Sequence, residues 1–125
     1  DSALSAARLL ASKNKIISIF QPHRYSRLRD LFHDFCSCFN DADKVLLLDV
    51  YPAGEDIIKG FESKNLEEGL TKYGHKDVSY IENPQKLANL LSNIINPGDV
   101  VIFLGAGTVT KIANRIEQDL KNENR

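Results

Sequence analysis

The chain reads KIISIFQPHRYSRLR from Lys15 to Arg29, and this stretch predicts a buried strand that passes directly into a helix. The β-branched and aromatic run that ends at Phe20 is typical of a strand covered on both faces. Pro22 ends the strand, and apolar residues at helical spacing follow it, with Ser26 as the predicted N-cap. A strand joined to a helix in this way is the repeating unit of a parallel α/β sheet.

The same alternation of strand and helix continues along the chain. Apolar runs predict further strands at residues 45–51, 78–81 and 99–104. Helical spacing predicts helices at residues 2–12, 26–39, 63–73, 83–95 and 109–120. We expect a single domain over residues 1–125, an α/β fold with a doubly wound, mostly parallel, Rossmann-like sheet and helices on both faces.

Two of these helices carry more specific expectations. In the helix at residues 63–73, Leu66, Leu70 and Tyr73 are expected to point inward. The next helix has Asn83 as its predicted N-cap, followed by proline at the favoured first position.

The charge balance and the apolar runs restrict the classes of partner. Sixteen Lys and Arg residues stand against 17 Asp and Glu residues, a net charge of −1, so a broad positive field for nucleic acid is not expected. No apolar run reaches the ~20 residues of a membrane span, and the sequence shows no signal-peptide pattern. We therefore expect a cytoplasmic protein without a nucleic-acid or membrane partner. Cys36 and Cys38 diverge around their helix and are expected to be free thiols.

Polar or glycine-containing loops follow three of the predicted strands. They comprise residues 21–27, 51–55 and 105–108. Because ligands of doubly wound folds bind at the carboxyl ends of the strands, we expect these loops to gather at one ligand-binding edge.

The first loop carries the basic groups of this edge. Arg24 and Arg27 are three residues apart, so both guanidinium groups could hold one anion beside the start of a helix. Alternatively, they pair with Asp30 and Asp34 on the helix surface. His23 could donate a hydrogen bond to a ligand or act as a base near neutral pH, and a structural role is equally open.

The other two loops offer weaker signals. Gly105 and Gly107 imitate a dinucleotide-binding loop, but Thr110 replaces the third glycine, so a glycine-lined ligand edge is expected and bound NAD is not. Glu55 could accept a hydrogen bond from an ammonium group or hold an arginine, or be an exposed carboxylate. The sequence has no P-loop, metal-ligand cluster or Ser/His/Asp set, so we expect no catalytic residue that works on this chain alone.

Three motifs together resemble a known family over nearly the whole chain. They are FQPHRYSRLRDLF at residues 20–32, LDVYPAGE at 48–55 and LGAG at 104–107. They resemble the C-terminal domain of the Mur ligases, most closely of those that join L-alanine to UDP-N-acetylmuramate. The resemblance implies that the UDP-sugar domain and the central ATPase domain of such a ligase are absent from this chain.

The resemblance also implies a reaction and the groups that serve it. ATP and Mg²⁺, bound mainly by the central domain, would phosphorylate the muramoyl carboxylate, and the amine of L-alanine would attack the acyl phosphate. This step belongs to peptidoglycan synthesis and cell-wall biogenesis, and so to cell shape and cell division. The implied substrate- and phosphate-binding residues are His23, Arg24, Arg27, Tyr51, Glu55, Gly105, Gly107 and Thr108. Thr108 stands where an acidic residue is common in the family.

The isolated chain is expected to be inactive as a ligase. Two other functions remain open at this point. One is a stand-alone Rossmann-like module that binds a nucleotide or a sugar phosphate through the glycine loop and the arginines. The other is an interaction domain whose basic loop docks an acidic partner.

Overall fold

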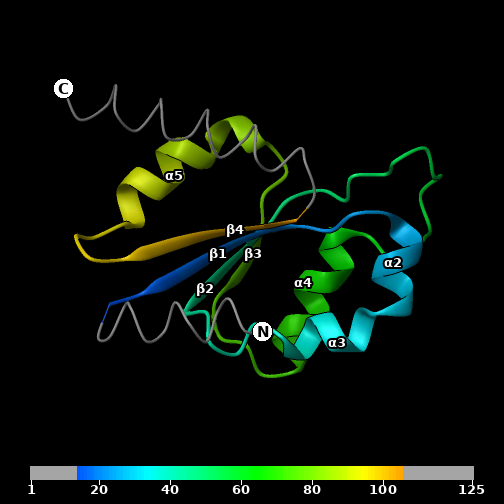
Figure 1. Ribbon diagram of the computed structural model, residues 1–125, viewed down its shortest axis with the longest axis horizontal. Coiled ribbons are helices and arrows are strands. Elements are labelled where there is room, and N and C mark those ends of the chain that lie inside the picture. Colours follow the sequence, from blue (N-terminus) through cyan, green and yellow to red (C-terminus); the bar gives the residue numbers. More distant parts are fainter. Residues whose placement is uncertain (1–13, 106–125) are drawn as a thin grey trace.

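The computed structural model describes residues 14–105, which form a four-stranded sheet in which every pair of neighbouring strands is parallel (Figure 1). The strands are β1 (Ile16–Gln21), β2 (Lys44–Leu47), β3 (Val78–Tyr80) and β4 (Val100–Gly105). Their order across the sheet is β3-β2-β1-β4, so the chain crosses over β1 to place its last strand on the far side. The predicted doubly wound α/β fold is confirmed.

Helices cover both faces of this sheet. On one face lie α2 (Tyr25–Asp30), α3 (Phe32–Ser37) and α4 (Ser63–Lys72). On the other lies α5 (Leu87–Ile94), preceded by the short 3₁₀ helix η1 (Pro84–Lys86) (Figure 1). The strands therefore have an apolar layer on each side, as their continuous apolar runs predict.

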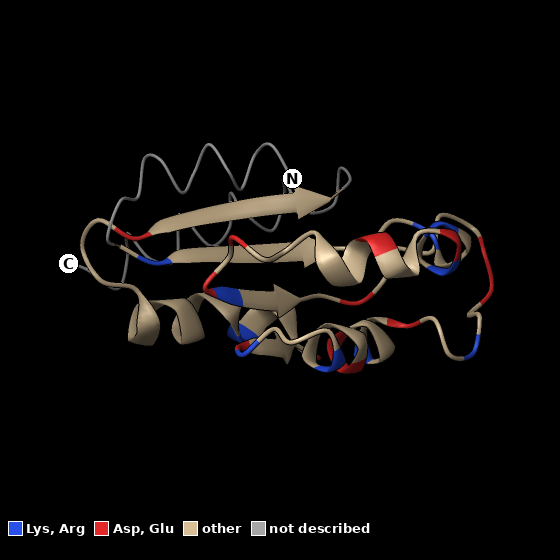
Figure 2. Cartoon of the chain, turned by 90° about the horizontal axis from the view of Figure 1, so that it is seen from below, with Lys and Arg blue, Asp and Glu red and all other residues tan. Residues whose placement is uncertain are grey.

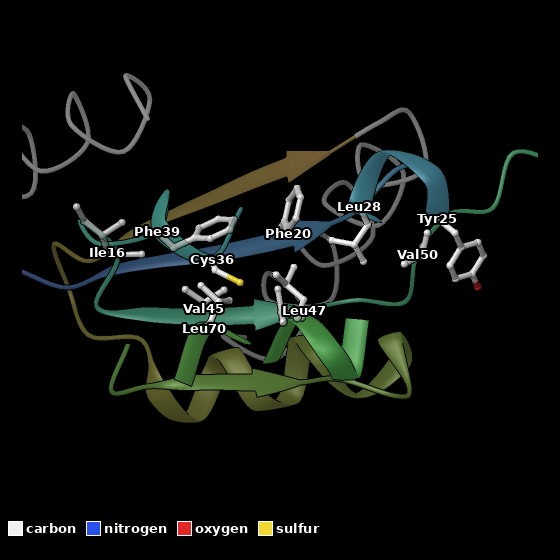
Figure 3. Close-up of a cluster of buried hydrophobic side chains, with 12 residues drawn as sticks. Ile16, Phe20, Tyr25, Leu28, Cys36, Phe39, Val45, Leu47, Val50 and Leu70 are labelled. Carbon is white, nitrogen blue, oxygen red and sulfur yellow. The ribbon is translucent and has the colours of Figure 1, made fainter. Parts of the chain in front are cut away.

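Alternate residues of β1 supply the two layers of the core. Ile16 and Phe20 face α2, α3 and α4, whereas Ile17 and Ile19 face α5. Figure 3 shows the first of these layers, where side chains from β1, β2, α2 and α3 meet. α4 packs closely against this layer at Gly69, because a Cβ at that position would lie 2.7 Å from the Sγ of Cys36.

The helix predicted at residues 26–39 is two helices that meet at Leu31, whose φ of −111° and ψ of 17° depart from helical values. α2 lies beyond the carboxyl ends of the strands, whereas α3 packs against α4 (Figure 1). The prediction that Ser26 is the N-cap is wrong, because the helix starts one residue earlier and Arg24 occupies the cap position.

Two other expectations need correction. The second strand ends at Leu47, short of the predicted residue 51, and the carbonyl of Leu48 accepts a hydrogen bond of 2.5 Å from the Ser63 hydroxyl. Tyr73 is half exposed and does not point inward. It follows the end of α4, and its hydroxyl lies 2.5 Å from Nδ1 of His33.

Other predictions agree with the structure or fall outside it. Asn83 caps η1, since its side chain accepts a hydrogen bond from the backbone N–H of Gln85. Both cysteines are free thiols, and burial raises the pKa of Cys38 to about 11.

The predicted helices at residues 2–12 and 109–120 lie outside the described residues. Within residues 14–105, none of the helices combines the length and apolar character that crossing a bilayer requires.

Candidate functional site

The candidate site lies where β1 and β4 end side by side. After β1 the chain builds β2 and β3 on one side of it and then places β4 on the other side, so the strand order reverses between β1 and β4. The carboxyl ends of strands at such a reversal are the usual place for a ligand in a doubly wound fold. Gln21 and Gly105 form the last register pair. Gly105 has a φ of 140°, and a Cβ there would lie 2.6 Å from the backbone oxygen of Gln21, so only glycine fits.

Two of the three predicted loops are joined at this edge. The backbone N–H of Tyr51 donates to the carbonyl of Pro22 at 2.9 Å, and the N–H of Arg24 donates to the carbonyl of Tyr51 at 2.8 Å. The rings of His23 and Tyr51 stack, with centroids 5.4 Å apart and planes 13° from parallel. The prediction that these loops share one edge is confirmed.

The backbone at Arg24 is strained. Its φ is 72° and its ψ is 138°, a region that residues with a Cβ rarely enter. Such a conformation costs about 1–3 kcal/mol and persists only when surrounding contacts impose it. Here the hydrogen bond to Tyr51 helps to impose it, and the guanidinium group is left exposed beside the start of α2.

The side chain of Glu55 binds the first turn of α2. Its carboxylate accepts hydrogen bonds from the backbone N–H of Ser26 at 3.1 Å and from the Ser26 hydroxyl at 2.5 Å. These two bonds lower the pKa of Glu55, and the charge of Arg24 contributes to the shift. Because Glu55 occupies this helix start, the groups that can face an anion are the arginine side chains.

Two hollows meet at this edge. The first, of about 500 Å³, we call the basic hollow, and it is lined by His23, Arg24, Ser26, Arg27, Asp30 and Leu31. The second, of about 340 Å³, we call the strand-end hollow, and it is lined by Phe20, Gln21, His23, Arg27, Phe35 and Gly105. His23 and Arg27 line both, so one ligand group in each hollow can contact the same two side chains.

The arginines of these hollows are not used in ion pairs within residues 14–105. Asp30, considered above as a partner for them, instead pairs with Arg29 at 3.0 Å. Lys and Arg alternate with Asp and Glu along the described part of the chain (Figure 2). Arg24 and Arg27 therefore act as a local pair of positive charges, suited to a small anion.

Residues 1–107 match the family model described as "Mur ligase, glutamate ligase domain". The chain belongs to this Mur ligase family. It is 50% identical over 120 residues to the UDP-N-acetylmuramate–L-alanine ligase of Phenylobacterium zucineum, covering 96% of this chain and 25% of that protein. The ligase of the same name from Rhodospirillum rubrum is 48% identical over 120 residues, with the same coverage. The chain thus spans about a quarter of the length of these relatives.

A solved structure supports the Mur ligase fold. A domain from Haemophilus ducreyi that is ascribed by its name to a UDP-N-acetylmuramate:L-alanyl-gamma-D-glutamyl-meso-diaminopimelate ligase superposes with a TM-score of 0.63. The match covers 95% of this chain and 79% of that domain at 14% sequence identity. At this identity the likeness concerns the fold alone.

Six of the eight predicted site residues of this Mur ligase domain lie in the described part of the chain. Around the two hollows the structure brings together His23, Arg24, Arg27 and Gly105, with Tyr51 stacked on His23 and Glu55 behind the helix start. Gly107 and Thr108 lie outside the described residues. Their contacts stay a prediction.

Sequence reasoning missed Gln21. This residue is only 8% exposed, and its side-chain Nε2 donates to the backbone oxygen of Asp49 at 3.2 Å. Its Oε1 has no hydrogen-bond partner among the residues that the structure describes. A polar residue at the end of a mostly apolar strand was the available signal, but the unpaired acceptor depends on contacts that the sequence does not display.

Proposed function

We propose that this chain is the amino-acid-delivering domain of a cytoplasmic, ATP-dependent ligase that joins L-alanine to UDP-N-acetylmuramate in peptidoglycan synthesis. The main support is the placement of His23 and Arg27 between the two hollows at the β1/β4 edge. The named activity of relatives that are about half identical over nearly all of this chain supports the choice of substrates.

The proposed reaction divides the work between this chain and the remainder of the ligase. That remainder would hold the UDP-sugar, and mainly its ATPase domain would bind ATP and Mg²⁺. Transfer of the terminal phosphoryl group to the muramoyl carboxylate gives an acyl phosphate. The alanine nitrogen then attacks the carbonyl carbon, the C–N bond forms, the bond to the phosphate oxygen breaks, and phosphate leaves as the nitrogen loses a proton.

The contribution of this chain is positioning and charge stabilisation. Arg27 would bind the carboxylate of the amino acid in the strand-end hollow. Arg24, which lines the basic hollow, would offset the charge of the phosphate. Holding the amine near the acyl phosphate replaces a random encounter by an aligned one, which can lower the barrier by several kcal/mol. Fixed positive charges at the phosphate lower it further.

The test is a fused ligase in which residues 1–125 replace the matching quarter of the Phenylobacterium zucineum enzyme. We expect the fused ligase to form UDP-N-acetylmuramoyl-L-alanine from ATP, UDP-N-acetylmuramate and L-alanine, and the chain alone to form none. A fused ligase that is folded but inactive would contradict the proposal. Micromolar binding of a nucleotide by the chain alone, measured by calorimetry, would instead favour a stand-alone binding module.

A further inference from the structure

We propose, on the basis of the ligase function proposed above, that Gln21 binds the amino group of the amino-acid substrate through its side-chain oxygen. Gln21 is the last residue of β1 and lines the strand-end hollow together with His23 and Arg27. Its role would be to orient the nitrogen that attacks the acyl phosphate.

The orientation of the Gln21 amide follows from its neighbour. The backbone oxygen of Asp49 can only accept a hydrogen bond, so the atom that lies 3.2 Å from it must be the NH₂ group. Oε1 is therefore the other terminal atom of the amide, and it has no partner within residues 14–105. A buried acceptor left unpaired costs free energy, and few native proteins keep one without a reason.

Further hydrogen bonding supports this arrangement from the neighbouring strands. Asp49 follows β2, and its carboxylate accepts a hydrogen bond from the hydroxyl of Tyr80, the last residue of β3. Gln21, Asp49 and Tyr80 thus connect the carboxyl ends of three strands. The bond to the Asp49 backbone oxygen directs the NH₂ group of Gln21 toward the end of β2, and Oε1 is the opposite end of the amide.

The polar side chains of the strand-end hollow complement an α-amino acid. The guanidinium of Arg27 donates hydrogen bonds and carries a positive charge, which suits the carboxylate. Oε1 of Gln21 accepts, which suits the ammonium group. Phe20 and Phe35 provide apolar surface for a small side chain such as a methyl group. The carbonyl can accept an N–H from the neutral amine as well, which leaves the nitrogen lone pair free to attack.

The experiment compares two ligands that differ in the amino group. L-alanine is the substrate, and propionate keeps the carboxylate and the methyl-bearing carbon but lacks the nitrogen. In the fused ligase, the KM for L-alanine and the inhibition constant of propionate against L-alanine are measured for the unsubstituted protein and for two Gln21 variants. Thermal unfolding of each protein is recorded alongside.

Gln21→Met removes the acceptor at similar length. We expect the KM for L-alanine to rise roughly 10- to 100-fold, the loss expected for one hydrogen bond to a charged group, while propionate inhibits as before. Gln21→Glu keeps an acceptor oxygen and adds a negative charge. It should bind L-alanine better than Gln21→Met does, and it should bind propionate less well than the unsubstituted protein does. Gln21→Met should therefore lower the preference for L-alanine over propionate, and Gln21→Glu should raise it.

Ser18→Ala is the matched control. Ser18 lies on the same strand, is fully buried, and also has a side-chain oxygen without a partner among the described residues, but it lines neither hollow. We expect it to leave both constants unchanged. If the unpaired oxygen of Gln21 were merely tolerated, as that of Ser18 is, Gln21→Met would behave like the control.

The outcomes separate the two proposals. Equal weakening of L-alanine and propionate in Gln21→Met, or no weakening, would overturn the role of Gln21 while leaving the ligase function intact. Equal damage by both Gln21 variants would do the same, because both lose the bond to Asp49 and only one loses the acceptor. If Gln21→Met does not fold, the direction of the shift in Gln21→Glu decides. An inactive unsubstituted ligase would overturn the proposed function and this inference with it.

Discussion

The two ends of the parallel sheet use their polar groups in different ways. At the amino-terminal end, carboxylates satisfy backbone groups: Asp43 accepts from the N–H of Ile16 at 2.7 Å, and Asp99 accepts from the N–H of Lys15 at 3.0 Å. At the carboxyl-terminal end, Arg24 adopts a strained conformation, and Gln21 keeps a buried oxygen without a partner among the described residues.

This difference teaches which end is arranged for stability and which for a ligand. A stable fold normally pairs its buried polar groups and avoids strained backbone, as the amino-terminal end does. Departures from that rule tend to gather at functional sites. The strained Arg24 and the unpaired oxygen of Gln21 lie at the edge where ligands of doubly wound folds bind, whereas the unpaired oxygen of Ser18 lies in the middle of β1.

The largest expected effect is a loss of ligase activity when Arg27, at the carboxyl-terminal end of the sheet, is replaced. In the fused ligase, Arg27→Ala should lower kcat/KM for L-alanine about 100- to 1,000-fold, because it removes a charged donor from both hollows. The free energy of unfolding should change by no more than about 0.5 kcal/mol, since the side chain is exposed. Arg29→Ala is the control: Arg29 is exposed, pairs with Asp30 and lines neither hollow. Equal losses of kcat/KM in Arg27→Ala and Arg29→Ala would contradict a specific role for Arg27 in the site.

The next effect is on stability through the amino-terminal end. Asp43→Ala leaves the N–H of Ile16 without its carboxylate partner, at a cost of about 1–3 kcal/mol. Urea denaturation of the chain measures this cost. The KM of the fused ligase for L-alanine should stay the same well below its unfolding temperature, and a raised KM would show that the two ends are not independent.

A smaller effect separates the strain at Arg24 from the function of its side chain. Arg24→Gly and Arg24→Ala both remove the guanidinium group, but only glycine adopts a φ of 72° without strain. We expect the glycine variant to be more stable than the alanine variant by about 1 kcal/mol in urea denaturation, with both impaired as ligases. If the alanine variant were the more stable of the two, the conformation would not be strained.

The smallest effect concerns the dependence of stability on pH. The folded pKa of Glu55 lies below its ordinary value of 4.5, so the contribution of Glu55 to stability is complete above that pH and is lost as the pH falls through the folded pKa. Glu55→Gln should therefore weaken the fall in Tm below pH 4.5. Glu68→Gln, on the exposed face of α4, is the control that removes the same charge, and an equal change in both variants would contradict the role given to Glu55.

Much of the fold can be predicted from the sequence because its causes are local. The β-branched run at Ile16–Phe20 predicts a buried strand, and the Asn83 cap depends on the backbone N–H two residues later. His23, Arg24 and Arg27 can be placed at the ligand edge because they follow a predicted strand, and ligands of doubly wound folds bind at the carboxyl ends of the strands. The motif that they form supports the same placement.

The remaining features depend on contacts between distant residues. The start of α2 is fixed by Glu55, 29 residues beyond Ser26, which is why the local rule misplaced the cap. The strain at Arg24 arises from its bond to Tyr51, and the unpaired oxygen of Gln21 from the position of the Asp49 carbonyl. These are the details that give the site its chemistry, and they appear only in three dimensions.

The central claim is that the carboxyl-terminal end of the sheet binds the ligand and the amino-terminal end maintains the fold. The most direct measurement compares kcat/KM for L-alanine with the free energy of unfolding in Arg27→Ala and Asp43→Ala. The claim predicts that Arg27→Ala loses activity at nearly unchanged stability, and that Asp43→Ala loses stability at nearly unchanged activity. A loss of activity in proportion to the loss of stability in both variants would contradict it.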